Sequence, residues 1–412
     1  MNRDADNRRK NTTLQQEAQE LLRSPDYFPQ FLTAMRESEL VGEERGACVI
    51  HLTAISAATK RPWNVIAKGS SSSGKNFLVS RVLRLCPPEV VHEITSSSDT
   101  AWNYAAKEFR NSIVYLQERN DAAGAVHPVR LLISEGRLVR IVTANEGGKR
   151  VTKRFVTEGP IASISTTTRD RIEIDDETRH VSVWVDQSQD QTKRILKSYL
   201  SQTESMTERE VEVWREAYRA VAKRATTLPV EIPGWFEVVA EKVYARDVAA
   251  RRYFPAFVNA CKTVALVHSF QAGREASPTS IRIDFADLAV ASILFGPVLV
   301  ESLHRKNDRN SETRRAVGEI LERGGDPVTC QGLAKYLDVS DDRAYARLRK
   351  AFEAGTIIRA NEPEKGNVKR YLPAPVPNFV PEPETVLANV PEIKKPVRLV
   401  HPLTGKQLKL TG

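Results

Sequence analysis

The sequence predicts a mixed α/β protein built around a parallel sheet, with helical regions on both sides of the sheet and a small separate unit near the C-terminus. Strand-like apolar runs alternate with helical patterns between residues 60 and 200, an order typical of a parallel sheet with covered faces. Helical periodicity dominates before and after that region. A last group, residues 312–373, combines short helical patterns with two short strands.

Composition places the chain among soluble globular proteins. Its 412 residues suffice for two or three domains, and hydrophobic residues make up 41%. The unbroken apolar stretches are shorter than the roughly 20 residues of a membrane span, and no secretory signal follows Met1, so we expect a cytoplasmic protein without a membrane partner. The four cysteines form no CxxC pair, which argues against a zinc site or a disulfide framework. The net charge of +9 favours polyanionic partners.

The first elements are helical. Residues 1–12 are polar and are expected to be disordered, whereas apolar residues recur at helical spacing over residues 13–59 and predict two or three helices. The apolar run from Trp63 to Lys68 ends at a glycine and indicates a buried strand. Phe77–Leu85 has a helical pattern, which two prolines end.

Further strands and helices follow in alternation, with one interruption. The strand-like runs are residues 90–94, 112–116, 161–165 and 181–185, and a helical pattern covers residues 100–109. Residues 137–156 interrupt the alternation of strands and helices, because two β-rich runs flank Gly147 and Gly148 as in a β-hairpin. The sequence therefore predicts a core over residues 60–200 that carries a hairpin insert.

The C-terminal half is mostly helical. Residues 201–305 show helical patterns, and residues 312–373 have three helical patterns followed by two strands, the order of a winged helix. Residues 374–412 are rich in proline and are expected to be a disordered tail.

The sharpest feature is the segment GSSSSGKN, which lies between a predicted strand and a predicted helix. It fits the phosphate-binding pattern GxxxxGK in the context that the pattern requires. Its backbone N–H groups and the helix N-terminus would bind the phosphates of ATP, and Lys75 would reach the β- and γ-phosphates. The alternative is a Ser/Gly-rich surface linker. The residues expected to bind the nucleotide are Gly69, Ser70, Ser71, Ser72, Ser73, Gly74, Lys75 and Asn76.

The positions expected to face Mg²⁺ carry amides. Asn76 stands where Ser or Thr normally ligates the metal, and Gln117 stands where Asp usually holds it through water. An amide oxygen binds magnesium less tightly, so nucleotide binding would survive while hydrolysis slows. Glu118, just beyond the strand at 112–116, would polarise the attacking water as general base. Its alternative role is that of an ordinary solvated acid.

Two later segments complete the expected site. The strand at 161–165 continues into hydroxyls that would place Thr166 or Thr167 beside the γ-phosphate, unless they form only a polar turn. Arg179 precedes the next strand and would reach the γ-phosphate of a neighbouring subunit, although most arginines are merely surface residues. The acids Asp175, Asp176 and Glu177 suggest a metal, but adjacent acids in a turn are usually solvated.

In this order the motifs resemble those of AAA+ ATPases of the helicase type. The chain is most similar in appearance to minichromosome-maintenance-type and mobile-element replication helicases, including primase-associated ATPases of phages. The resemblance covers residues 60–200 and extends loosely to the winged helix. It implies a helical lid over residues 201–305, with a sensor 2 arginine assigned to Arg252 in preference to its neighbour Arg251. It further implies Walker A at Gly69, Gly74, Lys75 and Asn76, Walker B at Gln117 and Glu118, sensor 1 at Thr167, and an arginine finger at Arg179.

The same resemblance implies ATP and Mg²⁺ as ligands and a homo-oligomeric ring such as a hexamer. It implies single-stranded or forked DNA as a partner, together with a primase or polymerase. The insert at 137–156 matches a hairpin that projects toward DNA in the ring channel.

Basic residues mark two candidate DNA contacts. In the hairpin, Lys149 and Lys153 would share one face while Arg150 and Arg154 share the other, a tip able to neutralise phosphates without reading sequence. Its alternative is a solvated hairpin. In the C-terminal unit, Arg343, Arg347 and Lys350 fall on one helix face, opposite Ala344, Leu348 and Phe352, and Lys369 lies in the presumed wing beside Lys365 and Arg370. The alternatives are a helix-dipole role and a winged helix used only for protein contact.

These observations leave three functions open. The first is an ATP-driven DNA translocase or helicase in the replication of a phage or mobile element. The second is a nucleotide-switched DNA-binding or helicase-loading protein with weak or no hydrolysis, which Asn76 and Gln117 favour. The third is a transcription regulator with an ATPase sensor, which the winged-helix pattern suggests.

Overall fold

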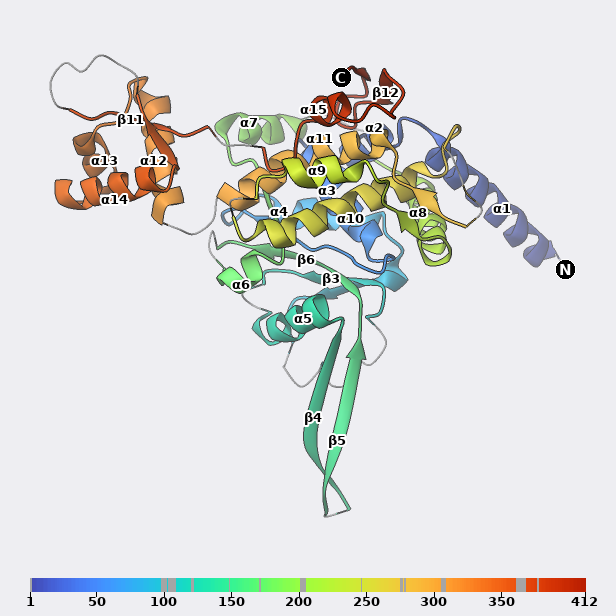
Figure 1. Cartoon of the computed structure of the whole chain (residues 1–412). Helices are drawn as coiled ribbons and strands as arrows, with labels where there is room; N and C mark the ends of the chain where they lie inside the picture. The colour runs from blue at the N-terminus through green and yellow to red at the C-terminus, as the bar shows by residue number, and fades with distance from the viewer. Residues whose placement is uncertain are drawn as a thin grey trace. The chain divides into compact units, whose positions relative to one another are not determined.

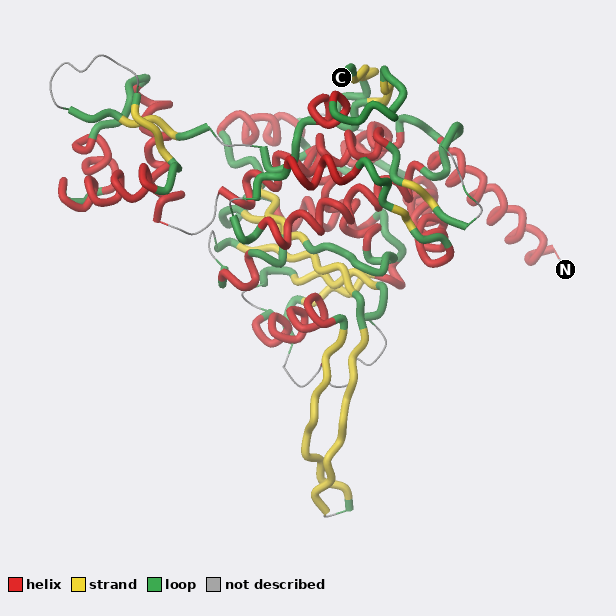
Figure 2. Tube along the Cα trace, viewed as in Figure 1, coloured by secondary structure: helices red, strands yellow, loops and turns green. Residues whose placement is uncertain are grey.

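The structure, a computed structural model, divides into two compact units. They are Met1–Leu299 with Phe379–Gly412, called the core unit, and Val300–Asn378, called the small unit. Helices, strands and loops of each unit are distinguished in Figure 2. The residues that the structure describes are 2–97, 102, 109–119, 122–147, 149–169, 172–200, 205–245, 247–274, 277, 279–304, 309–360, 368–375 and 378–412.

The core unit contains a five-stranded sheet of order β2-β3-β6-β1-β7, in which all neighbouring strands run parallel (Figure 1). The mixed α/β prediction with a parallel sheet is therefore confirmed. Because parallel strands end at the same edge, the residues that follow them meet there. The strands are β1 (Val65–Lys68), β2 (Val91–Ile94), β3 (Ser112–Leu116), β6 (Ile161–Thr167) and β7 (Val181–Trp184).

Helices cover both faces of this sheet (Figure 1). On one face lie α3 (Glu44–Ser56) and α4 (Lys75–Arg84), and on the other lie α5 (Ala123–Glu135) and the short α6 (Ile174–Glu177). This covering explains why β1, β3 and β6 are buried along their whole length. The helical pattern at 100–109 lies outside the described residues except for Trp102 and Phe109.

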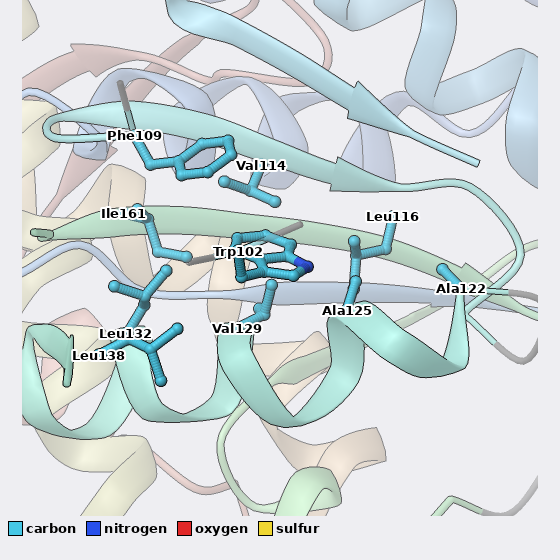
Figure 3. Packing of buried hydrophobic residues seen from close by; sticks show 10 residues of the cluster. All are labelled: Trp102, Phe109, Val114, Leu116, Ala122, Ala125, Val129, Leu132, Leu138 and Ile161. Atoms are coloured by element: carbon cyan, nitrogen blue, oxygen red, sulfur yellow. The ribbon is translucent and has the colours of Figure 1, made fainter. Parts of the chain in front are cut away.

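The predicted hairpin is formed by β4 (Arg137–Glu146) and β5 (Lys149–Glu158), paired antiparallel from Arg137↔Glu158 to Glu146↔Lys149. It leaves the sheet after α5 and projects away from it. Its base is fixed by a hydrophobic cluster (Figure 3), in which Leu138 packs with residues of α5, β3 and β6. The members of this cluster are Trp102, Phe109, Val114, Leu116, Ala122, Ala125, Val129, Leu132, Leu138 and Ile161.

The remaining helices of the core unit are α1 (Asn2–Arg23), α2 (Tyr27–Glu37), α7 (Gln189–Ser198), α8 (Glu208–Thr227), α9 (Phe236–Lys242), α10 (Ala250–His268) and α11 (Phe285–His304), with a 3₁₀ turn η1 at Pro88–Val90. Among these helices, α2, α8 and α10 contact α3, and α1 contacts α8. The sequence did not predict two short strands, β8 (Val230–Glu231) and β9 (Ile281–Arg282), which pair with each other in parallel.

Helices and strands occupy both ends of the chain, where the sequence predicted disorder. The backbone of residues 2–12 continues α1, because the helix is already anchored by Ala18, Leu21 and Leu22 and extends without a stop residue. Beyond residue 378 the chain forms α15 (Pro383–Ala388) and the antiparallel pair β12 (Val397–Val400) and β13 (Gln407–Leu410). Apolar residues between the prolines, including Phe379, are buried against the core unit and outweigh the proline-rich composition.

The small unit contains α12 (Arg309–Gly324), α13 (Cys330–Leu337), α14 (Asp341–Glu353) and the antiparallel strands β10 (Ile357–Arg359) and β11 (Tyr371–Pro373). Its core includes Val317, Leu333, Leu348 and Tyr371. One expectation for α14 is wrong. Phe352 is 39% exposed at the edge of this core, and Ala351 takes the inward place beside Ala344 and Leu348.

One described helix is long and apolar enough to cross a membrane, Phe285–Leu303 in α11. About two thirds of its apolar window (67%) is buried inside the fold, as in the core helix of a soluble protein. The feature is therefore weak evidence for a membrane span.

A buried histidine makes the stability of the core unit sensitive to acid. His51 shares a hydrogen bond of 2.8 Å with the Tyr27 hydroxyl and stacks on Phe31. Burial lowers its pKa to about 3. Because the unfolded chain binds the proton near pH 6.5 and the folded chain does not, stability is lost as the pH falls below 6.5, by roughly 1.4 kcal/mol per unit.

The expected result is a smaller loss of stability between pH 6.5 and 4.5 in His51→Gln than in the wild type. Glutamine can still hydrogen-bond Tyr27 but does not titrate. Urea midpoints measured at both pH values test this. Equal losses in the two proteins would show that His51 does not govern the acid sensitivity.

Candidate functional site

The glycine–serine loop, Gly69–Asn76, connects the end of β1 to the start of α4. Two of its glycines are required by geometry. A Cβ on Gly69 would lie 2.5 Å from Val185 Cγ2 and 2.6 Å from Ser73 Oγ, and Gly74 has a φ of +88°. Ser72 also adopts a left-handed φ of +62°. The loop thus turns tightly onto the N-terminus of α4, whose first N–H groups have no intrahelical partner and attract anions.

Lys75 is folded into this loop. It is only 4% exposed, and its Nζ donates to the Ser70 carbonyl at 2.8 Å. Gln187, which follows β7, completes the arrangement, because its Oε1 accepts from the Ser70 N–H at 3.1 Å and from the Ser70 hydroxyl at 2.5 Å. Sequence reasoning missed Gln187, which lies 117 residues from Ser70 and belongs to no recognisable motif.

Two polar atoms of the loop are buried without a hydrogen-bond partner among the described residues. They are Ser73 Oγ and Asn76 Oδ1. A buried oxygen without a donor is costly unless a ligand, an ion or water satisfies it. An amide oxygen is a suitable magnesium ligand, so Asn76 fits the metal position expected for it.

Glu118 lies at the same edge of the sheet, directly after β3. Its backbone has a φ of +48°, an uncommon conformation for a residue with a side chain. The conformation is held from β6, since the Glu118 N–H donates to Thr166 Oγ1 at 2.9 Å and the Arg119 N–H donates to the Thr166 carbonyl at 2.8 Å. Strained backbone of this kind is concentrated at functional sites.

The hydroxyls at the end of β6 stand between the glycine–serine loop and Glu118. β6 pairs with β1 on one side, with Thr167 opposite Lys68, and with β3 on the other. Both threonines are fully buried. Thr166 supports the turn at Glu118, whereas the Thr167 hydroxyl accepts from the Arg169 N–H at 3.1 Å. Sheet order therefore brings Lys75, Glu118 and Thr167 to neighbouring strand ends.

Arg179 lies near the opposite end of the strands, two residues before β7 begins. Val181 pairs with Val65, the first residue of β1, so roughly 10 Å of strand separates this level from the glycine–serine loop. The Arg179 guanidinium donates to Ser134 Oγ at 2.8 Å and to the Asp175 carbonyl. Neither of these hydrogen bonds joins Arg179 to the glycine–serine loop of the same chain.

Arg252, in the first turn of α10, lies beside the same segment. Its guanidinium is exposed and donates to Thr178 Oγ1, with a longer contact of 3.5 Å to the Asp175 carbonyl. The structure thus groups Arg252 with Arg179 rather than with Lys75.

Two of the three acids of α6, Asp176 and Glu177, are buried, which corrects the expectation that they are solvated. Asp176 is 2% exposed and forms an ion pair of 2.7 Å with Arg119. Glu177 is 7% exposed and forms an ion pair with Lys68, whose side chain is fully buried. Only Asp175 is exposed. Among the residues that the structure describes, no group of three or more His, Cys, Asp or Glu residues could hold a metal ion.

Two further groups near the sheet have shifted pKa values. Burial, followed by the nearby Arg119 charge, lowers the pKa of His180 to about 3, so this residue is neutral beside α6. Burial raises the pKa of Glu43 to about 7, and the Asp186 N–H that donates to its carboxylate at 2.5 Å opposes the shift.

The basic residues of the hairpin are distributed over its two faces as strand alternation requires. Arg150 and Arg154 are exposed and lie on the face that also carries Val139 and Ile141, which are 39% and 70% exposed. Lys153 is half-buried on the other face, in register with Val142. The side chain of Lys149 lies outside the described residues, although its backbone pairs with Glu146.

In the small unit, α14 presents its basic residues outward. Arg343 and Lys350 are exposed and Arg347 is half-buried, whereas Leu348 is fully buried. Lys369 and Arg370 precede β11 and are exposed, while Lys365 lies outside the described residues.

Comparison with models of known protein families finds no match to this chain. Comparison with curated proteins finds no match either.

Proposed function

We propose that the protein binds and hydrolyses ATP in the glycine–serine loop and uses it to move along DNA, as a helicase-like motor of the AAA+ type in replication. The observation that carries the proposal is the convergence of Lys75, Glu118 and Thr167 on adjacent strand ends in the order β3-β6-β1. These residues come from three separate segments of the chain, so their proximity is not a consequence of one local motif.

The residues present suit phosphoryl transfer to water. The loop N–H groups and Lys75 would hold the β- and γ-phosphates, and Lys75 would exchange the Ser70 carbonyl for phosphate oxygen. Glu118, whose backbone N–H is held by Thr166, would accept a proton from the attacking water. Asn76, with its unpartnered Oδ1, and Gln117 would hold Mg²⁺, which neutralises charge on the phosphates.

A second subunit would complete each site. Arg179 is held away from the loop of its own chain by Ser134 and Asp175, so its guanidinium would serve the γ-phosphate of a neighbour. Head-to-tail contacts of this type generate closed rings, and we propose such a homo-oligomer, for example a hexamer. Arg252, beside Arg179, would belong to the same contact instead of binding the nucleotide of its own chain.

DNA would be contacted by the hairpin and by the small unit. The exposed face with Arg150, Arg154 and Ile141 offers guanidiniums to phosphates and an apolar side chain to bases. We propose that the small unit is a winged helix in which Arg343, Arg347 and Lys369 contact phosphates. Single-stranded or forked DNA and a primase or polymerase partner belong to this proposal, as does a helical lid formed by the helices after residue 205.

The hairpin role predicts a salt-dependent loss of DNA affinity. In the variant Lys149→Glu with Arg150→Glu, we expect affinity for single-stranded DNA to fall at least tenfold at low salt, because phosphate contacts become repulsive. The slope of log affinity against log salt should become shallower, while ATP affinity stays unchanged. The matched control is Arg137→Glu at the hairpin base, which should retain more of the affinity. Unchanged binding over the salt series would exclude the hairpin as a DNA contact.

A second function is favoured by one observation. The amides Asn76 and Gln117 replace the usual metal-side groups, which suits a nucleotide-switched DNA-binding or loading protein that hydrolyses ATP slowly. ATPase turnover with and without single-stranded DNA separates the two. Turnover that DNA stimulates and that Glu118→Gln removes supports the motor. Clear ATP binding without detectable turnover supports the switch. Sequence-specific footprints would instead indicate a transcription regulator.

A further inference from the structure

A network of buried charged side chains joins the candidate site to the segment that carries Arg179. Lys68 is the residue immediately before Gly69, and Arg119 is the residue immediately after Glu118. The Lys68 side chain pairs with Glu177, and that of Arg119 pairs with Asp176 at 2.7 Å. Two of the strand ends that would contact the nucleotide, those of β1 and β3, are therefore tied to α6 through the neighbouring residue.

These ties determine where α6 lies. The helix is four residues long and the Asp175 side chain is exposed, so the buried acids Asp176 and Glu177 provide the described side-chain contacts with the strand ends. Additional polar contacts converge on the same acids. Ser182 donates to Glu177 at 3.1 Å, and Arg130 on α5 lies 3.5 Å from Asp176.

Arg179 in turn depends on α6 for its direction. Its guanidinium donates to the Asp175 carbonyl in α6, and its N–H donates to the Asp176 carbonyl at 3.0 Å. A shift of α6 would thus carry the guanidinium with it. Buried ion pairs are poor stabilisers compared with apolar packing but fix one arrangement of the groups they join.

We infer that Asp176 and Glu177, through their buried ion pairs with Arg119 and Lys68, are positioning residues that hold Arg179 for use by a neighbouring subunit. The inference rests on the proposed function. The two ion pairs would then couple neighbouring sites. The strand ends that contact the nucleotide of one subunit would also determine the position of Arg179, which contacts the nucleotide of the next subunit.

Mixed assemblies of variant subunits provide the test. Glu177→Gln and Asp176→Asn keep the shape of each side chain and remove its charge. We expect each variant alone to lose at least tenfold in ATP turnover while its ATP affinity, measured by fluorescent-nucleotide titration, stays within threefold of wild type. Asp175→Asn changes the exposed side chain of the same helix and keeps the backbone carbonyl that accepts from Arg179, so it is the matched control and should behave as wild type.

The mixing pattern separates positioning of Arg179 from damage to the variant's own site. If Glu177 positions Arg179, Glu177→Gln subunits still have a competent site, so mixing with Glu118→Gln subunits restores turnover. Mixing with Arg179→Ala subunits does not, because neither subunit then supplies a placed arginine. The reverse pattern, with rescue by Arg179→Ala only, would overturn the inference, as would wild-type turnover of both variants.

Failure of the proposed function has a different signature. If the wild-type protein has no ATP turnover, or if Arg179→Ala keeps full turnover, the proposed function is contradicted before any mixing experiment. Should Glu177→Gln fail to fold, as judged by circular dichroism and melting, Asp176→Asn carries the same mixing test, because Asn can still hydrogen-bond Arg119. For either variant, rescue by Glu118→Gln supports the inference and its absence contradicts it.

Discussion

Replacing Lys75 by alanine is expected to weaken ATP binding roughly 10- to 100-fold and to remove ATP hydrolysis. The ammonium lies in the fold of the glycine–serine loop, buried and held by the Ser70 carbonyl, where a phosphate oxygen would replace that carbonyl. Charge-assisted hydrogen bonds of this kind are worth about 1.5–3 kcal/mol each. Isothermal titration with ATP and Mg²⁺ measures the affinity, and phosphate release measures the turnover.

The control for Lys75→Ala is Lys60→Ala, which removes an exposed lysine shortly before β1. Both variants should melt as the wild type does, since Lys75 makes its hydrogen bond only within its own loop. ATP affinity of Lys75→Ala equal to that of Lys60→Ala would show that the glycine–serine loop does not bind the triphosphate.

Replacing Arg179 by alanine is expected to leave ATP affinity unchanged and to lower turnover by about 10³-fold or more. A guanidinium that contacts the γ-phosphate from a neighbour stabilises charge mainly in the transition state, so the loss appears in kcat rather than in binding. Mixing Arg179→Ala with Glu118→Gln subunits should restore part of the turnover, because each supplies what the other lacks.

Arg61→Ala, which removes an exposed arginine before β1, is the matched control and should retain wild-type turnover. A loss of ATP affinity in Arg179→Ala would place the arginine in its own site and contradict the sharing of sites. If the mixture does not recover turnover, Arg179 does not act on the ATP of a neighbouring subunit.

The sheet was predictable because local pattern and burial agree there. The run 112–116 is apolar at every position apart from its first serine, and the structure forms β3 over the same residues. The hairpin was predictable for a different reason, since paired glycines with β-rich flanks leave few alternatives. The sequence also indicated the residues at the strand ends, but not which strands are neighbours, which only the fold determines.

The missed features depend on tertiary contacts. The local sequence predicts a solvated turn at Asp176 and Glu177. It does not show that the two acids pair with Arg119 and Lys68, which are more than 50 residues away along the chain. The C-terminal segment read as disordered from its prolines, although Phe379 and Leu410 are buried. In both cases, long-range burial outweighs composition.

In the proposed ATP complex, residues 69–76 wrap a triphosphate whose γ-phosphate faces Glu118 and Thr167. The most direct measurement is an experimental structure of the assembled protein with Mg²⁺ and a slowly hydrolysed ATP analogue. We expect the phosphates to lie along the N-terminus of α4, with the Lys75 ammonium on a phosphate oxygen and Arg179 of a neighbouring subunit at the γ-phosphate. A nucleotide bound elsewhere, or a γ-phosphate out of reach of Glu118, would contradict this expectation.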